Sequence, residues 1–398
     1  EQQEARLNEL GGELSGAGVN TSRLTEENER LSKSYERVKK SQEELAKVNA
    51  ALEQNNAAIS KTKTQLAGTV GTLAALGTAI YAGPVRKAAE FEAQMSTVEA
   101  ISGATADEMK RLPDEAKRMG ATTQFTAVEA GKALEYMAMA GWKTDQMLGG
   151  LPGIMNLAAA SGEDLGQVSD IVTDALTAFN MTADQAGRFA DVLAQASSNS
   201  NTNVAMMGAT FQKVAPVAGA LGYSVEDVSL AIGLMANASI KSEVAGTSLK
   251  TALANMAKPT KQMKEYMDKY GISLTNADGS MKSFREVVDN LRSSLGGLSE
   301  TEQVAAATAI FGKESFAGML AIVNASEADF QKLSDSVNNS AGAAERMAQI
   351  KLDNFQGKVT LLQSAVEGLQ IALGDALLPT FTEGAEKAAE LISKLTEF

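Results

Sequence analysis

The sequence predicts an almost entirely α-helical protein, in which an N-terminal coiled coil leads into a multi-helix domain of helical hairpins with one small β-hairpin. Two patterns predict this fold class. A hydrophobic residue recurs every seven positions in the first 66 residues, and helix-capping pairs recur beyond residue 100, separated by Ala, Met and Leu at three- and four-residue spacings. Of the 398 residues 44% are hydrophobic, so the chain can bury one or two packed cores.

The seven-residue repeat predicts a coiled coil over residues 21–66, preceded by a hinge over residues 1–20 that contains four glycines. A straight helix turns once in about 3.6 residues, so an unbroken seven-residue repeat indicates supercoiling around partner helices. The alternative is a single helix whose apolar stripe packs on the chain's own globular core. The predicted self-association seam consists of Leu24, Leu31, Val38, Leu45, Leu52, Ile59 and Leu66.

Residues 64–85 contain no charged side chain and are a candidate membrane segment, since about 20 apolar residues can span a bilayer. However, Thr and Gly outnumber Leu and Ile here, and the seven-residue repeat continues. Residues 67–86 are therefore predicted to form an uncharged helix of small residues at the dry end of the coil, with membrane insertion as the alternative. The candidate membrane residues are Leu66, Leu73, Leu76 and Ile80.

A helical core domain is predicted over residues 87–270 from capping boxes, in which a Ser or Thr and a Glu or Gln three residues later satisfy each other's free main-chain amides. The boxes are Thr105 with Glu108, Thr126 with Glu129, Thr182 with Gln185 and Ser299 with Glu302.

A weak repeat of about 40 residues suggests three stacked helical hairpins in this core, a solenoid-like arrangement. The alternative is that similar caps recur because short helices recur. Left-handed helix ends are predicted at Gly141, Asn180 and Gly222, and the starts of the following helices at Ser161, Ser197 and Ser239.

The C-terminal part is predicted to begin with a β-hairpin over residues 271–283, where apolar and polar residues alternate around Asn-Ala-Asp-Gly. Short helices follow over residues 284–340. Residues 341–398 are predicted to form long helices, the first of them ended at residue 378 by Pro379.

The composition excludes most enzyme classes, because the chain contains no His and no Cys. No Ser-His-Asp or Cys-His pair, imidazole or thiolate metal site, or disulfide is possible. We predict no catalytic residue, no cofactor and no metal; Asp278 and Asn276 lack the remaining ligands of a calcium loop. A net charge of -13 opposes specific nucleic-acid binding. Trp142 and the methionines are expected to pack the core.

Four blocks of sequence follow one another in a recognisable order. Residues 91–141 read FEAQMSTVEAISGATADEMKRLPDEAKRMGATTQFTAVEAGKALEYMAMAG, and further blocks lie at 246–256, 311–323 and 355–379. In wording and order these blocks resemble the core region of bacteriophage tail tape measure proteins from long-tailed phages. The resemblance covers residues 88–379, and the succession of blocks carries it, because Ala-rich helices alone produce some similarity.

The resemblance implies a helical ruler in the lumen of the phage tail tube, assembled in the bacterial host cytoplasm, whose length sets the length of the tube and which aids DNA ejection. Implied partners are other copies of the chain, three in all if tail-tip symmetry applies, together with tail tube, tail hub or baseplate, and tail assembly chaperone proteins, and the host membrane during infection. The chain starts in mid-pattern without Met, so we expect a fragment of a longer protein.

The rival interpretation is a membrane-active pore-former or a receptor-like coiled-coil protein, in which residues 64–85 enter a bilayer. An appended cell-wall hydrolase is a third class, and no sequence feature supports it.

Overall fold

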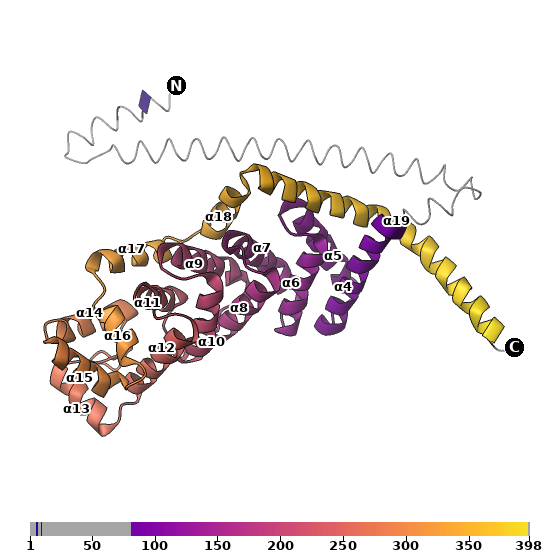
Figure 1. Ribbon diagram of the computed structural model, residues 1–398. Coiled ribbons are helices and arrows are strands. Elements are labelled where there is room, and N and C mark those ends of the chain that lie inside the picture. The colour runs from indigo at the N-terminus through magenta and orange to yellow at the C-terminus, as the bar shows by residue number, and fades with distance from the viewer. Residues whose placement is uncertain (1–4, 7–8, 10–80, 397–398) are drawn as a thin grey trace. The chain divides into compact units, whose positions relative to one another are not determined.

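The computed structural model describes residues 5, 6, 9 and 81–396 (Figure 1), and within these residues every element is a helix. The predicted almost all-α fold class is therefore confirmed. The predicted hinge and coiled coil, with the whole self-association seam, lie outside the described residues except for positions 5, 6 and 9. The candidate membrane residues Leu66, Leu73, Leu76 and Ile80 also lie outside them.

The first half of the described chain forms two rows of stacked helices. The even-numbered helices form the first row, in which each helix packs on the next even-numbered helix. The odd-numbered helices form the second row in the same way. The first row contains α4 (Arg86–Ser102), α6 (Ala127–Met139), α8 (Leu165–Ala178), α10 (Val204–Ala220) and α12 (Ser242–Ala257). The second row contains α5 (Glu108–Thr122), α7 (Thr144–Ser161), α9 (Ala186–Asn199), which follows the short η2 (Ala183–Gln185), and α11 (Val225–Asn237).

Three reversals of the chain occur at the residues predicted to be left-handed. The φ angle is +82° at Gly141, +52° at Asn180 and +79° at Gly222. A β-carbon disfavours this conformation, and Gly or Asn tolerates it best, so these positions end one helix and turn the chain toward the next. The repeat of helical hairpins predicted from these positions is confirmed by the stacked rows.

The predicted starts of the following helices are wrong. Ser161 is the last residue of α7, and Ser197 lies inside α9. Ser239 lies in the loop before α12 with a φ of +65°. Instead, the side chains of Asp164 and Asn203 accept the main-chain N–H three residues ahead and start α8 and α10. An aspartate or asparagine is at least as good an N-cap as serine, and these residues stand where the backbone has already turned.

All four predicted capping pairs form reciprocal hydrogen bonds. In Thr126 and Glu129, for example, the Thr126 amide donates to the carboxylate at 2.8 Å and the Glu129 amide donates to the hydroxyl at 3.2 Å. The same exchange joins Thr105 with Glu108, Thr182 with Gln185, and Ser299 with Glu302. Two further boxes, Ser224 with Asp227 and Ser283 with Glu286, were missed although their spacing is the same.

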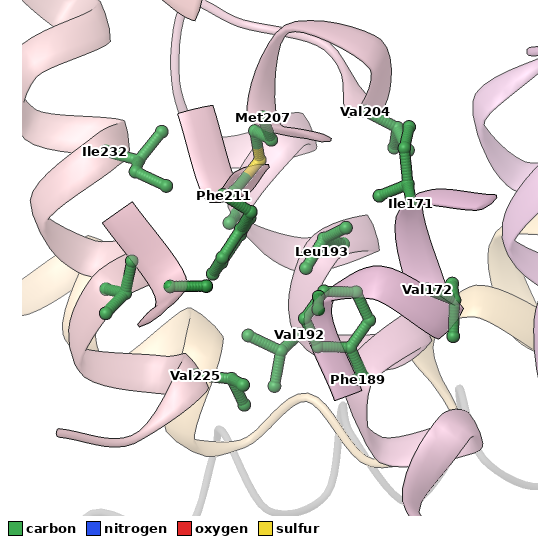
Figure 2. Packing of buried hydrophobic residues seen from close by; sticks show 14 of the residues in the cluster. Ile171, Val172, Phe189, Val192, Leu193, Val204, Met207, Phe211, Val225 and Ile232 are labelled. Carbon is green, nitrogen blue, oxygen red and sulfur yellow. The ribbon is translucent and has the colours of Figure 1, made fainter. Parts of the chain in front are cut away.

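Aromatic and aliphatic side chains from both rows meet in a continuous core (Figure 2). The ring of Phe211 on α10 lies edge-on to Phe189 on α9, with 5.4 Å between the ring centroids. Met137, Met207 and Met235 are fully buried, as predicted for core packing, but the prediction is wrong for Met139 and Met206, which are 65% and 38% exposed. Trp142 is 7% exposed at the corner between α6 and α7, where it lies against Gly150, which confirms the predicted corner packing.

The predicted β-hairpin is reduced to a single antiparallel bridge between Thr275 and Met281, and the described residues contain no strand. The main-chain hydrogen bonds of the hairpin run from the Asn276 amide to the Ser280 oxygen and from the Lys282 amide to the Leu274 oxygen, both at 2.8 Å, and beyond them Ile272 and Phe284 are buried in the core. Inside the turn, hydrogen bonds from the hydroxyl and the amide of Ser280 lower the pKa of Asp278. That carboxylate therefore stabilises the turn itself.

The chain then reverses along the domain. Helices α13 (Lys261–Tyr270), α14 (Phe284–Leu295), α15 (Glu300–Phe311) and α16 (Phe316–Val323) lie at the far end of the rows, beside α11 and α12. From there α17 (Glu327–Asn338) packs on α9 and α11, α18 (Ala343–Leu352) packs on α7 and α9, and α19 (Phe355–Thr396) packs on α4, α5 and the turn η1 (Tyr81–Val85). We call α17, α18 and α19 the return strap; Figure 1 shows it in orange to yellow along the rows.

The predicted helix from residue 341 to 378 begins within two residues of α18, but it is wrong in its interior and at its C-terminal end. The chain breaks after Leu352, and the side chain of Asn354 accepts the Gly357 amide at 2.9 Å to start α19. Pro379 lies inside α19 rather than ending it. A proline removes one main-chain donor and disfavours the turn before it. Pro379 is exposed, and Leu378 and Thr382 on either side of it line an open groove, so packing does not explain why the helix continues.

Substitution of Asp191 tests how α18 is held. Its carboxylate accepts the main-chain N–H of Gly342 at 2.7 Å and that of Ala344 at 2.9 Å, so α9 caps the start of α18. Asp191→Ala leaves two part-buried amides without that partner and is expected to lower the free energy of unfolding by about 1–3 kcal/mol in urea titrations. Asp114→Ala, an exposed site on α5, is the control; an equal loss there would contradict the cap.

Acid titration tests the capping boxes. Hydrogen bonds from the Ser299 hydroxyl and amide hold the pKa of Glu302 below the ordinary value of a glutamate, about 4.5. Because the folded pKa is the lower one, the box stabilises the fold above about pH 4.5 and loses this effect as the pH falls through the folded pKa. Glu302→Gln keeps the box but does not titrate. We expect its urea midpoint to fall less than that of the parent chain between about pH 5 and pH 3. Glu300→Gln should retain the parent's pH dependence.

Candidate functional site

The candidate site in the described residues is a contact surface formed by the long helix α19 and its neighbours. Among the described residues, no three His, Cys, Asp or Glu side chains come together in a way that could hold a metal ion. No helix within residues 81–396 is both long and apolar enough to cross a membrane. The features that remain are the junction where α19 closes on α4 and α5, and the surface that this junction creates.

A close backbone approach forms the centre of the junction. Gly374 on α19 lies against Pro84 in η1, and a β-carbon at position 374 would overlap the main-chain oxygen of Pro84 and the side chain of Ala88. A glycine is therefore required for α19 to lie this close to the start of the described domain. The neighbouring Ile371 is fully buried in the same contact face.

Charged pairs flank this approach. The amine of Lys87 on α4 lies 3.1 Å from the Glu367 carboxylate of α19, which is only 13% exposed, and their hydrogen bond raises the pKa of Lys87. The amine of Lys117 on α5 lies 2.6 Å from the Asp375 carboxylate. Each lysine pairs with a carboxylate that α19 brings against the domain, although the second oxygen of Glu367, Oε1, is buried without a hydrogen-bond partner. Both acids must face the body, and this fixes the rotation of the helix.

A third polar contact lies one turn nearer the start of α19. The Ser364 hydroxyl donates to the main-chain oxygen of Gln124, in the loop between α5 and α6, at 3.0 Å. Ser364 is buried at 2% exposure. The side chains of Ser364, Glu367 and Asp375 thus contact the loop between α5 and α6, α4 and α5 respectively, and together they hold α19 along the first helices of the domain.

A groove of about 640 Å³ lies between α4, α5 and the far half of α19. Its lining combines apolar residues with an acidic rim. The amine of Lys117 already has two partners within the domain, because it pairs with Asp375 and lies 5.1 Å from the centre of the Phe91 ring. An acidic rim repels phosphate and favours a cationic partner. The lining residues are Phe91, Glu92, Met95, Ser96, Glu99, Met109, Pro113, Lys117, Asp375, Leu378, Pro379, Thr382, Glu383 and Glu386.

A second, smaller pocket of about 320 Å³ lies between α8 and α10 and includes Asp174. Burial, followed by the charge of Asp170, raises the pKa of this carboxyl group. Gln212 is the other polar side chain in the lining. A lone carboxylate beside an amide and apolar walls provides neither a nucleophile with a base nor a ligand set.

Analysis of the sequence did not identify the residues that form the junction. Lys87 and Glu367 are far apart in the chain, and local patterns do not report such a pairing. One signal was present: Gly357, Ser364 and Gly374 place small residues along one side of a long helical segment, a pattern typical of close helix approach. The predicted self-association seam and membrane residues are not part of the described domain, so they stay predictions.

Comparison with known proteins gives consistent matches. The family described as phage-related minor tail protein matches residues 113–312. The tape measure protein of Pneumococcus phage Dp-1 is 38% identical over 315 residues, which are 79% of this chain and 27% of that protein. The probable tape measure protein of Escherichia phage P2 is 24% identical over 343 residues, 83% of this chain and 42% of that protein. The probable tape measure protein of Clostridium phage phiCD119 is 23% identical over 339 residues, which are 81% of this chain and 35% of that protein.

The chain therefore spans between about a quarter and two fifths of the length of these relatives. No solved structure matches it significantly.

Adding a methyl group at Gly374 tests the junction. Gly374→Ala forces α19 away from Pro84, and we expect a loss of roughly 1–3 kcal/mol in the free energy of unfolding and faster proteolysis between residues 352 and 378. Gly368→Ala on the same helix is the matched control, because a β-carbon there meets no atom within 4 Å. The control should gain up to about 1 kcal/mol from helix propensity. Equal effects of the two substitutions would contradict the close approach.

Proposed function

We propose that this chain, which belongs to the tape measure family of phage tail proteins, acts as a structural ruler whose helical length contributes to the length of the tail tube. The observation that carries the proposal is the 38% identity to a tape measure protein over 315 residues, which are 79% of the chain. The mechanism is steric. A helix advances about 1.5 Å per residue, so the predicted coil from Leu24 to Leu66 would span about 63 Å.

The structure supports this proposal through its surface chemistry. The described domain is built from stacked helices without a reaction centre, and its principal groove has an acidic rim. With a net charge of -13, the chain has little tendency to bind the DNA that shares the tail with it. We propose that the protein lies in the lumen of the tail tube and that the described domain stays a folded block there.

The partners follow from the same proposal. The seam from Leu24 to Leu66 would associate with further copies of the chain, in a three-stranded coil if the tail tip imposes its symmetry. Tail tube proteins would surround the assembled helices, a hub or baseplate protein would hold one end, and an assembly chaperone would protect the chain before the tube forms. Release from the tail during infection would aid DNA ejection, and the uncharged residues 64–85 would then contact the host membrane.

Deletion of residues 31–58 in the intact phage tests the ruler. These 28 residues are four whole heptads, so the seam stays in register. We expect tails shorter by about 42 Å in electron micrographs, at about 1.5 Å for each deleted residue. The control keeps the length and replaces Leu31, Val38 and Leu45 with Ala, which weakens association without shortening the helix.

The two variants separate length from association. Shortened tails in the deletion and tails of normal length in the control support the ruler. Normal tails in the deletion that fail to deliver DNA would assign the coil to ejection or membrane passage instead.

A further inference from the structure

The groove between α4, α5 and the far half of α19 is an open trench with an apolar floor. Phe91 and Met95 on α4 are buried in its lining, and Met109 on α5 and Leu378 on α19 are half-buried there. The residues along its edges are exposed, so the trench is open to water. Small molecules usually bind in cavities that enclose most of their surface. An open trench fits an elongated partner better.

Two walls of the groove present residues at the spacing of a single helix face. Steps of three or four residues separate successive lining residues, and such steps place side chains side by side along a helix. The lining of α19 runs from Asp375 to Glu386, about 16 Å at about 1.5 Å per residue. A helix of about three turns covers that distance and offers apolar anchors at i, i+3 or i+4, and i+7. The wall residues are Glu92, Ser96 and Glu99 on α4, and Leu378, Thr382 and Glu386 on α19.

The charges of the groove are nearly all negative. Lys117 is the only cation among its described lining residues, and it already pairs with Asp375. The carboxylate of Glu383 pairs with Lys387 on the same helix. Three carboxylates form no ion pair within the described part of the chain, and they lie on two different walls. These free carboxylates are Glu92 and Glu99 on α4 and Glu386 on α19.

This charge pattern distinguishes between possible occupants. A phosphate group would meet carboxylates on both walls and would be repelled. A second copy of this chain carries a net charge of -13 and is repelled at long range. A helix with cations on both sides of an apolar stripe complements the floor and both walls at once. Charge complementarity of this kind gives an interface its specificity and speeds association.

We propose that the groove is a docking site for a basic amphipathic helix of another protein. The helix lies between α4 and α19, with its apolar stripe on the floor and its lysine or arginine side chains beside the free carboxylates of both walls. Because α19 provides one wall, the site is complete only while α19 is packed on α4 and α5. The site depends neither on the predicted seam at Leu24 to Leu66 nor on the ruler role.

A synthetic probe tests the site in the full chain. The probe is a fluorescein-labelled peptide of about 14 leucine and lysine residues, nearly four turns, in which lysines flank a single stripe of leucines. Its dissociation constant is measured by fluorescence anisotropy. Glu92→Lys combined with Glu99→Lys should weaken binding at least about tenfold, because repulsion replaces attraction along one wall. Asp184→Lys combined with Glu314→Lys makes the same change in net charge at exposed sites outside the groove lining and should alter binding less than about twofold.

A steric variant tests the trench without changing its charge. Ser96→Trp places a large ring between the two glutamates of α4 and should weaken binding of the probe at least about tenfold. Thr97→Trp is the matched control, since Thr97 is equally exposed on α4 but does not line the groove, and it should bind as the parent chain does. Both positions are exposed, so circular dichroism should stay unchanged in both variants.

Four results would overturn the proposal. Equal weakening by the two charge-reversal pairs would show that the acidic chain attracts the peptide as a whole. Equal affinity for a peptide of the same composition in which leucine and lysine alternate would show that the apolar floor takes no part. Absence of binding to the parent chain at about 100 μM probe would show that the groove does not take such a helix. A changed oligomeric state of Ser96→Trp in sedimentation would assign the groove to a second copy instead.

Discussion

The packing of α19 against α4 and η1 is the constraint on which the arrangement of the domain depends. Stacked hairpins bury only the surface between their two rows and leave the outer face of the second row open to water. The return strap covers that face, with α17 and α18 over α7, α9 and α11. It can end beside α4 only because Gly374 allows α19 to touch Pro84. In a simple stack each hairpin contacts only its neighbours. Here the last helix, α19, packs on the first, α4, and residues from 81 onward form one compact unit.

Charge and aromatic contacts fix the two ends of the strap. At the start, Phe330 on α17 is fully buried, and the guanidinium groups of Arg285 and Arg292 lie 4.3 Å and 5.5 Å from the centre of its ring. Both arginines also bond Glu327, at 3.0 Å and 2.9 Å. At the other end, Lys87 and Lys117 hold α19. Polar contacts at both ends set the position of a strap whose apolar residues face partly outward.

Local chemistry predicted local structure well, and contacts between distant segments could not be predicted. Capping boxes such as Thr126 with Glu129, and left-handed ends such as Gly222, depend on a few adjacent residues. The predictions for Pro379 and for the hairpin around Thr275 were wrong: α19 continues through the exposed proline, and the hairpin is limited to one bridge between Thr275 and Met281. The junction of Lys87 with Glu367 joins segments 280 positions apart, and no sequence pattern marks it.

Hydrogen exchange of the native chain tests most directly whether the return strap closes the domain. If it does, the amides of α4 and those of α19 up to residue 378 should become exchangeable in one opening reaction, with the same free energy and the same dependence on denaturant. The account would be contradicted if α19 exchanged through a low-energy local opening while α4 to α8 kept full protection, since the rows would then be stable without the strap.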